Sequence, residues 1–359
     1  MRSFFRLLFI ATLLFSCSNE PDTIKIGSVL PLTGDAASWG KPVQNAVQMA
    51  VDEINESGGI KGKTISIIFE DSKAEPATGV SVMQKLVNQD KPIAVIGAVA
   101  SSVSIAIVPI AEKNKVPLIS PASTSPKLTG ISKYFFRVIP TDKLRAEKFA
   151  EHIYGKGISE LDIVFINNEG GAGAKEAFVK KYNELGGKVT LVEGYAQGTN
   201  DFRSVLNKSK KSSANALMII SYPEDTSTLL RQIRELGINK EIFALTEALD
   251  DPQVVANAQG AADGVEYIVP AVPEGPKVDE FRRKYEERYG NPPQTFTAEG
   301  YDIVYIIKSI LEISSEMSSE AILSGLDYLS NFDGVSGDVS FDENGDVKKE
   351  MIVKKINNK

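Results

Sequence analysis

Hydrophobic positions in the first part of the chain alternate between short continuous runs and a helical spacing. Ile24–Leu30 is an apolar run that predicts a strand, and apolar positions across 43–54 then recur every three or four residues, as on one face of a helix. Pro42 stands where the first turn of this helix tolerates proline, and the glycine pair at 58–59 ends it. The same alternation continues with strands at 64–69, 93–96 and 116–119 and helices at about 77–87 and 101–114.

The pattern starts again in the second part of the chain. Strands at 161–166, 189–195, 217–220 and 242–245 alternate with helices at 174–185, near 202–208 and at 226–236. The last third is less regular, with a strand at 265–269 and helices at 279–289, 301–313 and 321–329. Two successive runs of strand–helix units imply two parallel sheets covered by helices on both faces. We therefore predict an α/β chain of two doubly wound lobes that the chain joins by more than one crossing, which makes a hinge.

The composition and charge of the chain argue against some classes of binding partner. The chain has 359 residues, of which 42% are hydrophobic and 24% charged, and this suits a globular protein of two domains. The formal net charge is −7, and basic residues are interspersed with acidic ones along the chain. Because no basic stripe is present, we expect neither a nucleic-acid partner nor an anionic membrane surface.

The N-terminus has the pattern of an export signal. Arg2 and Arg6 precede an apolar run at 7–15, which is too short to span a bilayer. The run ends at Cys17, the only cysteine of the chain, and the stretch at 14–17 is similar to a bacterial lipobox, in which the cysteine becomes the lipid-modified first residue. The alternative is an incidental or buried thiol. We predict a signal peptide at 1–17 and a polar tether at 18–23, with the exported protein lipid-anchored at the cell envelope, in the periplasm or on the outer face of the cytoplasmic membrane.

The stretch ISPASTSPKL at 119–128 follows a predicted strand with small hydroxyl-bearing residues and prolines. These residue types form turns and cap helices. They also leave backbone groups uncovered, because small side chains cannot hide them. The stretch therefore predicts either an ordinary turn or a loop that displays hydroxyl and N–H groups to a small polar ligand.

Five short motifs occur in an order that resembles a known family. They are PLTG at 31–34, GGIKG at 58–62, VIG at 95–97, PLISPA at 117–122 and LLRQ at 229–232. The chain resembles the leucine/isoleucine/valine-binding proteins, which are type I periplasmic binding proteins that feed an ABC importer, from about residue 24 to residue 353. The resemblance implies an N-terminal lobe at 24–142 plus 270–350 and a C-terminal lobe at 143–269 plus 351–359. It also implies a monomer without cofactor, metal or enzymatic activity, which delivers an amino acid to a permease and ATPase complex.

The resemblance assigns the first-lobe half of a ligand site. Ser101 follows a predicted strand and opens a helix, where the family has a carboxylate-binding serine. Helix N-termini suit anions because their N–H groups are unpaired. Ala122 would accept from a ligand ammonium through its carbonyl, and Thr124 would donate to the ligand carboxylate. The alternatives are an N-cap for Ser101 and a turn residue for Thr124.

The second-lobe half is assigned in the same way. Tyr222 and Glu247 each follow a predicted strand, and in the family a tyrosine and a glutamate at these positions receive the α-ammonium. A carboxylate in a closing cleft is costly unless it is paired, and a ligand cation would be its partner. The alternatives are a solvated loop acid and a strand-end aromatic residue. Both polar ends together favour a zwitterionic α-amino acid, branched-chain or otherwise uncharged.

The pocket for the ligand side chain is less defined. Trp39 and Phe296 are its candidate walls, with core or hinge packing as the alternative. Gly171 departs from the family, which commonly has an aromatic residue there. Without that wall we expect the pocket to admit longer or aromatic side chains, and Gly171→Tyr to penalise large ligands more than small ones.

Three other functions compete with this one. Gly171-Ala172-Gly173 with Glu193 suggests a dinucleotide-binding enzyme, but Glu176 stands where the third glycine belongs. A hydrolase would need a base, and the only histidine, His152, lies in a helical pattern. A ligand-binding subunit of a membrane sensor, or a binder of a related small carboxylate or amide, would use the same cleft.

Overall fold

The computed structural model describes residues 23–357 and contains two large sheets, each flanked by helices. The sheet of the first lobe is parallel, with the strand order β2-β1-β3-β4-β5. Its strands are β1 (Ile24–Leu30), β2 (Ile65–Asp71), β3 (Ala94–Gly97), β4 (Leu118–Ser120) and β5 (Phe135–Arg137).

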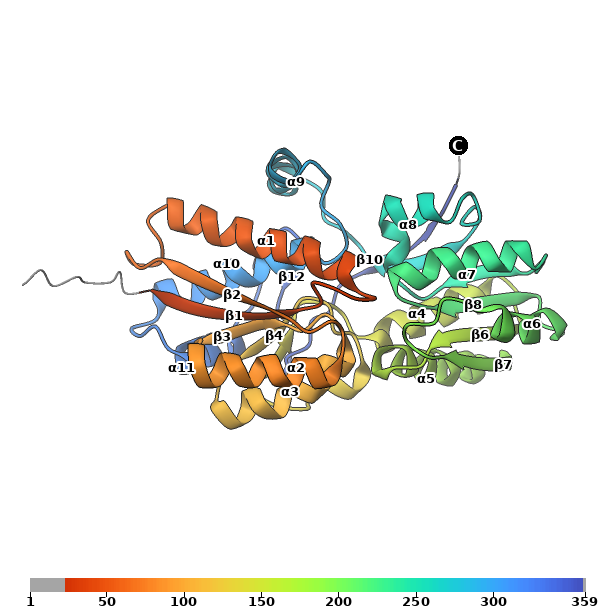
Figure 1. Cartoon of the computed structure of the whole chain (residues 1–359), viewed down its shortest axis with the longest axis horizontal. Coiled ribbons are helices and arrows are strands. Elements are labelled where there is room, and N and C mark those ends of the chain that lie inside the picture. The colour runs from red at the N-terminus through yellow and green to blue at the C-terminus, as the bar shows by residue number, and fades with distance from the viewer. Residues whose placement is uncertain (1–22, 358–359) are drawn as a thin grey trace, which may run out of the picture.

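Helices cover both faces of this first sheet. Figure 1 shows α1 and α10 on one face and α2 and α3 on the other. The helices of this lobe are α1 (Ala37–Glu56), α2 (Pro76–Lys85), α3 (Ser101–Asn114), α9 (Pro276–Tyr289), α10 (Thr297–Ile313) and α11 (Ser319–Asp327). A π-helical turn, η1 (Leu86–Asp90), extends α2, and a two-stranded ribbon, β11 (Phe332–Gly334) and β12 (Gly337–Val339), follows α11.

The second lobe contains a six-stranded sheet of order β13-β10-β9-β8-β6-β7, in which β13 alone is antiparallel to its neighbour. Its strands are β6 (Glu160–Ile166), β7 (Lys188–Tyr195), β8 (Ala216–Ile220), β9 (Glu241–Ala244), β10 (Glu266–Pro270) and β13 (Met351–Lys355). Its helices are α4 (Asp142–Gly155), α5 (Glu169–Glu184), α6 (Arg203–Lys211), α7 (Pro223–Glu235) and α8 (Pro252–Asn257). The predicted fold of two doubly wound α/β lobes is confirmed.

The chain crosses between the lobes after β5, after β10 and before β13. These crossings lie against one another: Arg137 donates its backbone N–H to Gly345 (3.0 Å), and Ala271 donates to Glu350 (2.8 Å). The buried Arg137 side chain also pairs with Asp346 (2.6 Å). Crossings bonded to each other form a hinge, as predicted, because they allow rotation of the lobes while keeping their ends aligned.

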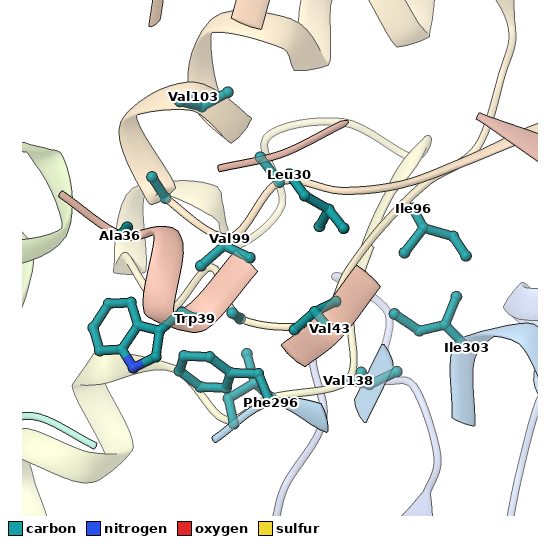
Figure 2. Packing of buried hydrophobic residues seen from close by; sticks show 14 of the residues in the cluster. Leu30, Ala36, Trp39, Val43, Ile96, Val99, Val103, Val138, Phe296 and Ile303 are labelled. Carbon is teal, nitrogen blue, oxygen red and sulfur yellow. The ribbon is translucent and has the colours of Figure 1, made fainter. Parts of the chain in front are cut away.

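The buried core of the first lobe reaches the gap between the lobes. Leu30 and Ile96 lie in the sheet and pack with Val43 of α1 and Ile303 of α10, and all four are fully buried (Figure 2). Trp39 and Phe296 lie side by side at the end of this cluster. The core thus ends in two aromatic rings that face the second lobe.

Three local expectations are wrong. Pro42 lies inside α1, because the helix begins at Ala37 and not near the proline. The structure also contains β5, which the sequence pattern did not predict: it has only three residues, too few to show a period. Helix α5, which was expected from residue 174, begins earlier, at Glu169. Asn168 caps it there by accepting from the Gly171 N–H (2.9 Å).

Candidate ligand-binding cleft

One cavity lies between the carboxyl ends of strands from the two sheets, where α/β proteins bind ligands. Its walls are Trp39, Val99, Ala100, Ser101, Ala122, Thr124, Asp142, Arg145, Ile166, Gly170, Gly171, Ala174, Ile220, Ser221, Tyr222, Leu245, Thr246, Glu247 and Phe296. All eight residues predicted for the ligand site are among them. The lobes are close together, since α1 contacts α7 and α3 contacts α5, and the cavity has a volume of only about 50 Å³.

A second cavity of about 300 Å³ lies on the other side of Glu247 and Phe296, at the hinge. It is larger, but its walls come from the crossings, from α9 and from the segment at 293–299, which includes the start of α10. The start of α3, the 120s loop and Tyr222 line the smaller cavity instead. Polar groups of both lobes therefore converge in the smaller one, which makes it the better candidate for a polar ligand.

The first-lobe wall consists of the start of α3 and the loop after β4. Ser101 opens α3 after Ala100, and no side chain caps the helix. The Ser101 hydroxyl oxygen accepts from the Ser125 N–H (3.2 Å), so its own proton remains free to donate. The serines of the ISPASTSPKL stretch hold this wall together: Ser120 and Ser123 both donate to the Ala98 carbonyl, at 2.7 and 2.9 Å.

The role predicted for Thr124 differs from what the structure shows. Its hydroxyl donates to Asp142 at 2.8 Å and not into the cavity. Asp142, at the start of α4, is a carboxylate and hence the stronger acceptor. Thr124 lines the cleft, but its single hydroxyl proton is committed to Asp142 in this structure.

Glu247 has a partner that sequence reasoning missed. Arg145 of α4 contacts Glu247 with one guanidinium nitrogen and Asp142 with another. All three side chains are at least nine-tenths buried. In this structure Arg145, and not a ligand cation, is the counter-charge of Glu247, because α4 of the same lobe brings it there.

The charges of this cluster do not balance. Asp142 and Glu247 bring two negative charges against the one positive charge of Arg145. Burial raises the pKa of the Glu247 carboxyl above its ordinary value, Arg145 opposes this, and the charge of Asp142 raises it further. Burial would lower the pKa of Arg145, but Glu247 and Asp142 together hold it above its ordinary value. The cleft thus holds surplus negative charge that one additional cation would neutralise.

Three aromatic rings close one side of the cleft. Trp39 meets Tyr222 and Phe296 edge to face, with ring centroids 5.3 and 5.4 Å apart. Tyr222 comes from the second lobe, so this contact joins the two lobes. Phe296 has a positive φ of 64°, which is rare for an aromatic residue and is typical of functional sites.

The expectation of an open pocket wall at Gly171 is wrong. A Cβ atom there would lie 2.1 Å from the backbone oxygen of Ile166, so the helix packs too closely for any side chain. At Gly170 a Cβ would meet only ordinary contacts, at 3.7 Å from the Ser101 hydroxyl across the cleft. This wall of the cleft therefore has room for a side chain at position 170 but not at 171, and Gly171→Tyr is not a usable test of pocket size.

The features that suggested enzymes lie elsewhere or have structural roles. His152 of α4 bonds to Glu266 (2.8 Å) and does not line the cleft. The glycines at 171 and 173 lie within α5, whose N-terminus is capped by Asn168 and carries Glu169. Across residues 23–357, no group of three or more His, Cys, Asp or Glu side chains could hold a metal ion. In the same part of the chain, no helix has the length and apolar character needed to cross a membrane.

The first turn of α7 carries a titratable acid. Burial raises the pKa of Asp225, at the start of α7, to about 7, although the Tyr195 hydroxyl opposes this. The charges of Asp35, from the first lobe, and of Glu224 raise it further. An acid with a raised pKa binds its proton more tightly in the folded, closed chain. Its stability penalty is therefore complete above pH 7 and declines as the pH falls toward 4.

We predict that Asp225→Asn raises Tm by a few degrees at pH 8 and by much less at pH 5, because asparagine carries no charge at either pH. Thermal unfolding at both pH values measures this. Asp201→Asn, at an exposed carboxylate paired with Arg203, is the control and should show no such difference. An equal effect of Asp225→Asn at the two pH values would contradict the assignment.

The comparisons with known proteins agree with this geometry. The family model described as periplasmic binding protein matches residues 23–359. A leucine-, isoleucine-, valine-, threonine- and alanine-binding protein of Pseudomonas aeruginosa is 30% identical over 343 residues, covering 93% of this chain and 89% of its own. The branched-chain amino acid transporter substrate-binding protein LivJ of Streptococcus pneumoniae, solved with isoleucine, is 30% identical, with a TM-score of 0.85 over 93% of this chain and 96% of its own.

A more distant structure shares the fold alone. A solute-binding protein of an ABC transporter from R. palustris, solved with benzoate, is 18% identical, with a TM-score of 0.85 over 93% of each chain. The matched family model spans nearly the whole chain, and two lobes, three crossings and a polar interlobe cleft are present. The chain belongs to the periplasmic binding protein family, among the relatives of the leucine/isoleucine/valine-binding proteins.

Proposed function

We propose that this protein captures an uncharged α-amino acid, branched-chain or other, in the interlobe cleft and delivers it to an ABC importer outside the cytoplasm. The observation that carries the proposal is the polarity of the cleft. One wall offers an uncapped helix N-terminus with Ser101, and the opposite wall offers Glu247 within a cluster of net negative charge. These two walls are complementary to the two ends of a zwitterion.

The carboxylate end of the ligand faces α3 in this proposal. The first N–H groups of a helix lack intrahelical partners and carry the positive end of the helix dipole. The Ser101 hydroxyl adds a donor, because its oxygen is already used by Ser125. The Thr124 hydroxyl contributes only if Asp142 gives up its bond.

The ammonium end faces Glu247, with the Tyr222 ring and the Ala122 carbonyl beside it. Arg145 neutralises one of the two carboxylates of the cluster, and the ligand ammonium neutralises the other. A sugar or other neutral ligand would leave this buried negative charge without a partner, which is costly.

The hinge allows the two lobes to close on the ligand. The ligand binds to the lobe that holds Ser101, Ala122 and Thr124, and the lobe that holds Tyr222 and Glu247 then closes on it. The importer's permease and ATPase recognise the closed form. The protein acts as a monomer that binds and releases its ligand unchanged and has no enzymatic step.

The proposal of a lipid anchor is argued from the sequence alone, because Cys17 lies outside the described residues. We propose that the lipid-modified Cys17 is the first residue of the mature chain, which keeps the protein at the cell envelope near its importer. Several acyl chains on one residue give stable attachment, whereas one chain is marginal. The mass of the mature N-terminal peptide tests this directly.

Two alternatives use the same cleft. A membrane sensor in place of an importer would need no change in the site. An amine-free carboxylate is suggested by the benzoate bound to the R. palustris protein, but such a ligand would leave the surplus charge at Glu247 unpaired.

A thermal-shift screen of the amino acids and of simple carboxylates and amides distinguishes the ligand classes. At a ligand concentration a hundred times Kd, binding adds about 2.7 kcal/mol to stability, which raises Tm by several degrees. We expect a clear shift from at least one uncharged amino acid and none from its amine-free analogue. A shift from carboxylates alone would contradict the role of Glu247.

A further inference from the structure

The guanidinium of Arg145 is only partly used by the protein. Two of its nitrogens meet Asp142 and Glu247. Its Nε is buried and has no hydrogen-bond acceptor among the described residues. Arg145 is 6% exposed and forms part of the cleft wall. A buried donor without an acceptor costs free energy, so an acceptor is expected to reach it when the cleft is occupied.

A second unsatisfied group lies in the same cleft. The indole Nε1 of Trp39 is buried and also has no acceptor in the described part of the chain. Arginine Nε and tryptophan Nε1 can only donate. The cleft therefore holds two buried donors that an acceptor atom on a bound ligand would satisfy.

The ligand's α-carboxylate does not supply this oxygen in our account. Its two oxygen atoms belong at the start of α3, where the backbone N–H groups and Ser101 await an anion. Within the protein, both oxygens of Asp142 are already used, one by Arg145 and the other by Thr124. An oxygen atom on the ligand's side chain would supply an acceptor to these donors.

The charge balance of the cleft favours a neutral oxygen acceptor over a second carboxylate. With the ligand bound, its ammonium pairs with Glu247, Arg145 pairs with Asp142, and the α-carboxylate pairs with the helix terminus. A second carboxylate would find no positive partner in the closed cleft. A neutral hydroxyl or amide oxygen would satisfy Arg145 without adding charge.

We propose that Arg145 is a specificity-determining residue that binds a neutral oxygen acceptor on the side chain of the ligand. The site then prefers amino acids with a hydroxyl or amide side chain to those with a hydrocarbon side chain of the same shape. This inference rests on the proposed function, because it presupposes an amino acid in the cleft.

Isosteric pairs of amino acids test the preference in the unmodified protein. Threonine and valine differ by a hydroxyl in place of a methyl group, and asparagine and leucine by an amide in place of a branched hydrocarbon. We expect threonine to bind about tenfold to a hundredfold more tightly than valine, or asparagine than leucine, in titration calorimetry. Aspartate should bind more weakly than asparagine.

A charge-preserving variant assigns the effect to Arg145. Arg145→Lys keeps a cation between Asp142 and Glu247 but removes the Nε donor and the planar fork. Its ratio of affinities for threonine and valine, or for asparagine and leucine, should fall to within about threefold, because one hydrogen bond is lost. Arg283→Lys, at an exposed arginine paired with Glu280 and Glu287, should keep the ratio of the unmodified protein.

The outcomes separate the two proposals. If no amino acid binds, the proposed function fails and this inference fails with it. If amino acids bind but valine and leucine bind as well as threonine and asparagine, the function stands and the inference is overturned. A preference that survives Arg145→Lys would overturn the role of Arg145. The series on the unmodified protein decides the preference even if the variant fails to fold.

Discussion

Glu247→Gln is expected to weaken amino-acid binding by about a hundredfold or more. The substitution removes the counter-charge of the ligand ammonium inside a closed cleft. Breaking one partner of a buried charge pair costs about 3–5 kcal/mol, and each 1.4 kcal/mol corresponds to roughly tenfold in affinity. Titration calorimetry on the variant and the unmodified protein measures the ratio of the two Kd values.

The fold should tolerate this change. In Glu247→Gln, Arg145 still pairs with Asp142, so no lone buried charge remains. Tm without ligand should therefore stay close to that of the unmodified protein. Glu169→Gln is the matched control, since Glu169 pairs with Lys127 of the first lobe at 2.7 Å but both side chains are exposed. Such a surface pair is worth little, so a loss of affinity as large as that of Glu247→Gln would show that the effect is not specific to the cleft.

Gly171→Ala is expected to destabilise the fold by about 1–3 kcal/mol or more, as overpacked sites do. The added Cβ would lie 2.1 Å from the Ile166 carbonyl oxygen, and neither the helix backbone nor β6 can move away freely. Gly170→Ala is the matched control one residue earlier on the same helix. Its Cβ meets nothing closer than 3.6 Å, and alanine favours the helix over glycine.

Denaturant unfolding of both variants measures this difference in the free energy of unfolding. We expect Gly171→Ala to lower the midpoint clearly and Gly170→Ala to leave it unchanged or to raise it slightly. If both variants unfold at the same midpoint, the close packing at position 171 is not a constraint, and the correction of the pocket wall from 171 to 170 loses its basis.

The sequence predicted those residues of the site that directly follow a strand, because the hydrophobic pattern shows where each strand ends. The buried run before Ser101 and the apolar spacing after it define a strand, a turn and a helix, and the structure places α3 at the expected residues. Tyr222 and Glu247 likewise follow strands that were predicted. Parallel strands end at one edge of their sheet, so local prediction sufficed to bring these residues together.

No pattern in the sequence predicted the cluster of Arg145, Asp142 and Glu247. Arg145 contacts Asp142 one turn away, but Glu247 lies far along the chain, after β9 of the same lobe. No periodicity encodes that contact. The same applies to Gly170 and Gly171, because only the packing against Ile166 shows which of two adjacent glycines can carry a side chain.

The most direct test of an amino-acid site in this cleft is calorimetry with ligand pairs that differ only in the α-ammonium. L-threonine is compared with 3-hydroxybutanoate, and L-leucine with 4-methylpentanoate. We predict saturable binding of at least one of the amino acids, with one site per chain, and binding of its amine-free analogue that is about a hundredfold weaker or absent. Equal or tighter binding of the amine-free acid would contradict it.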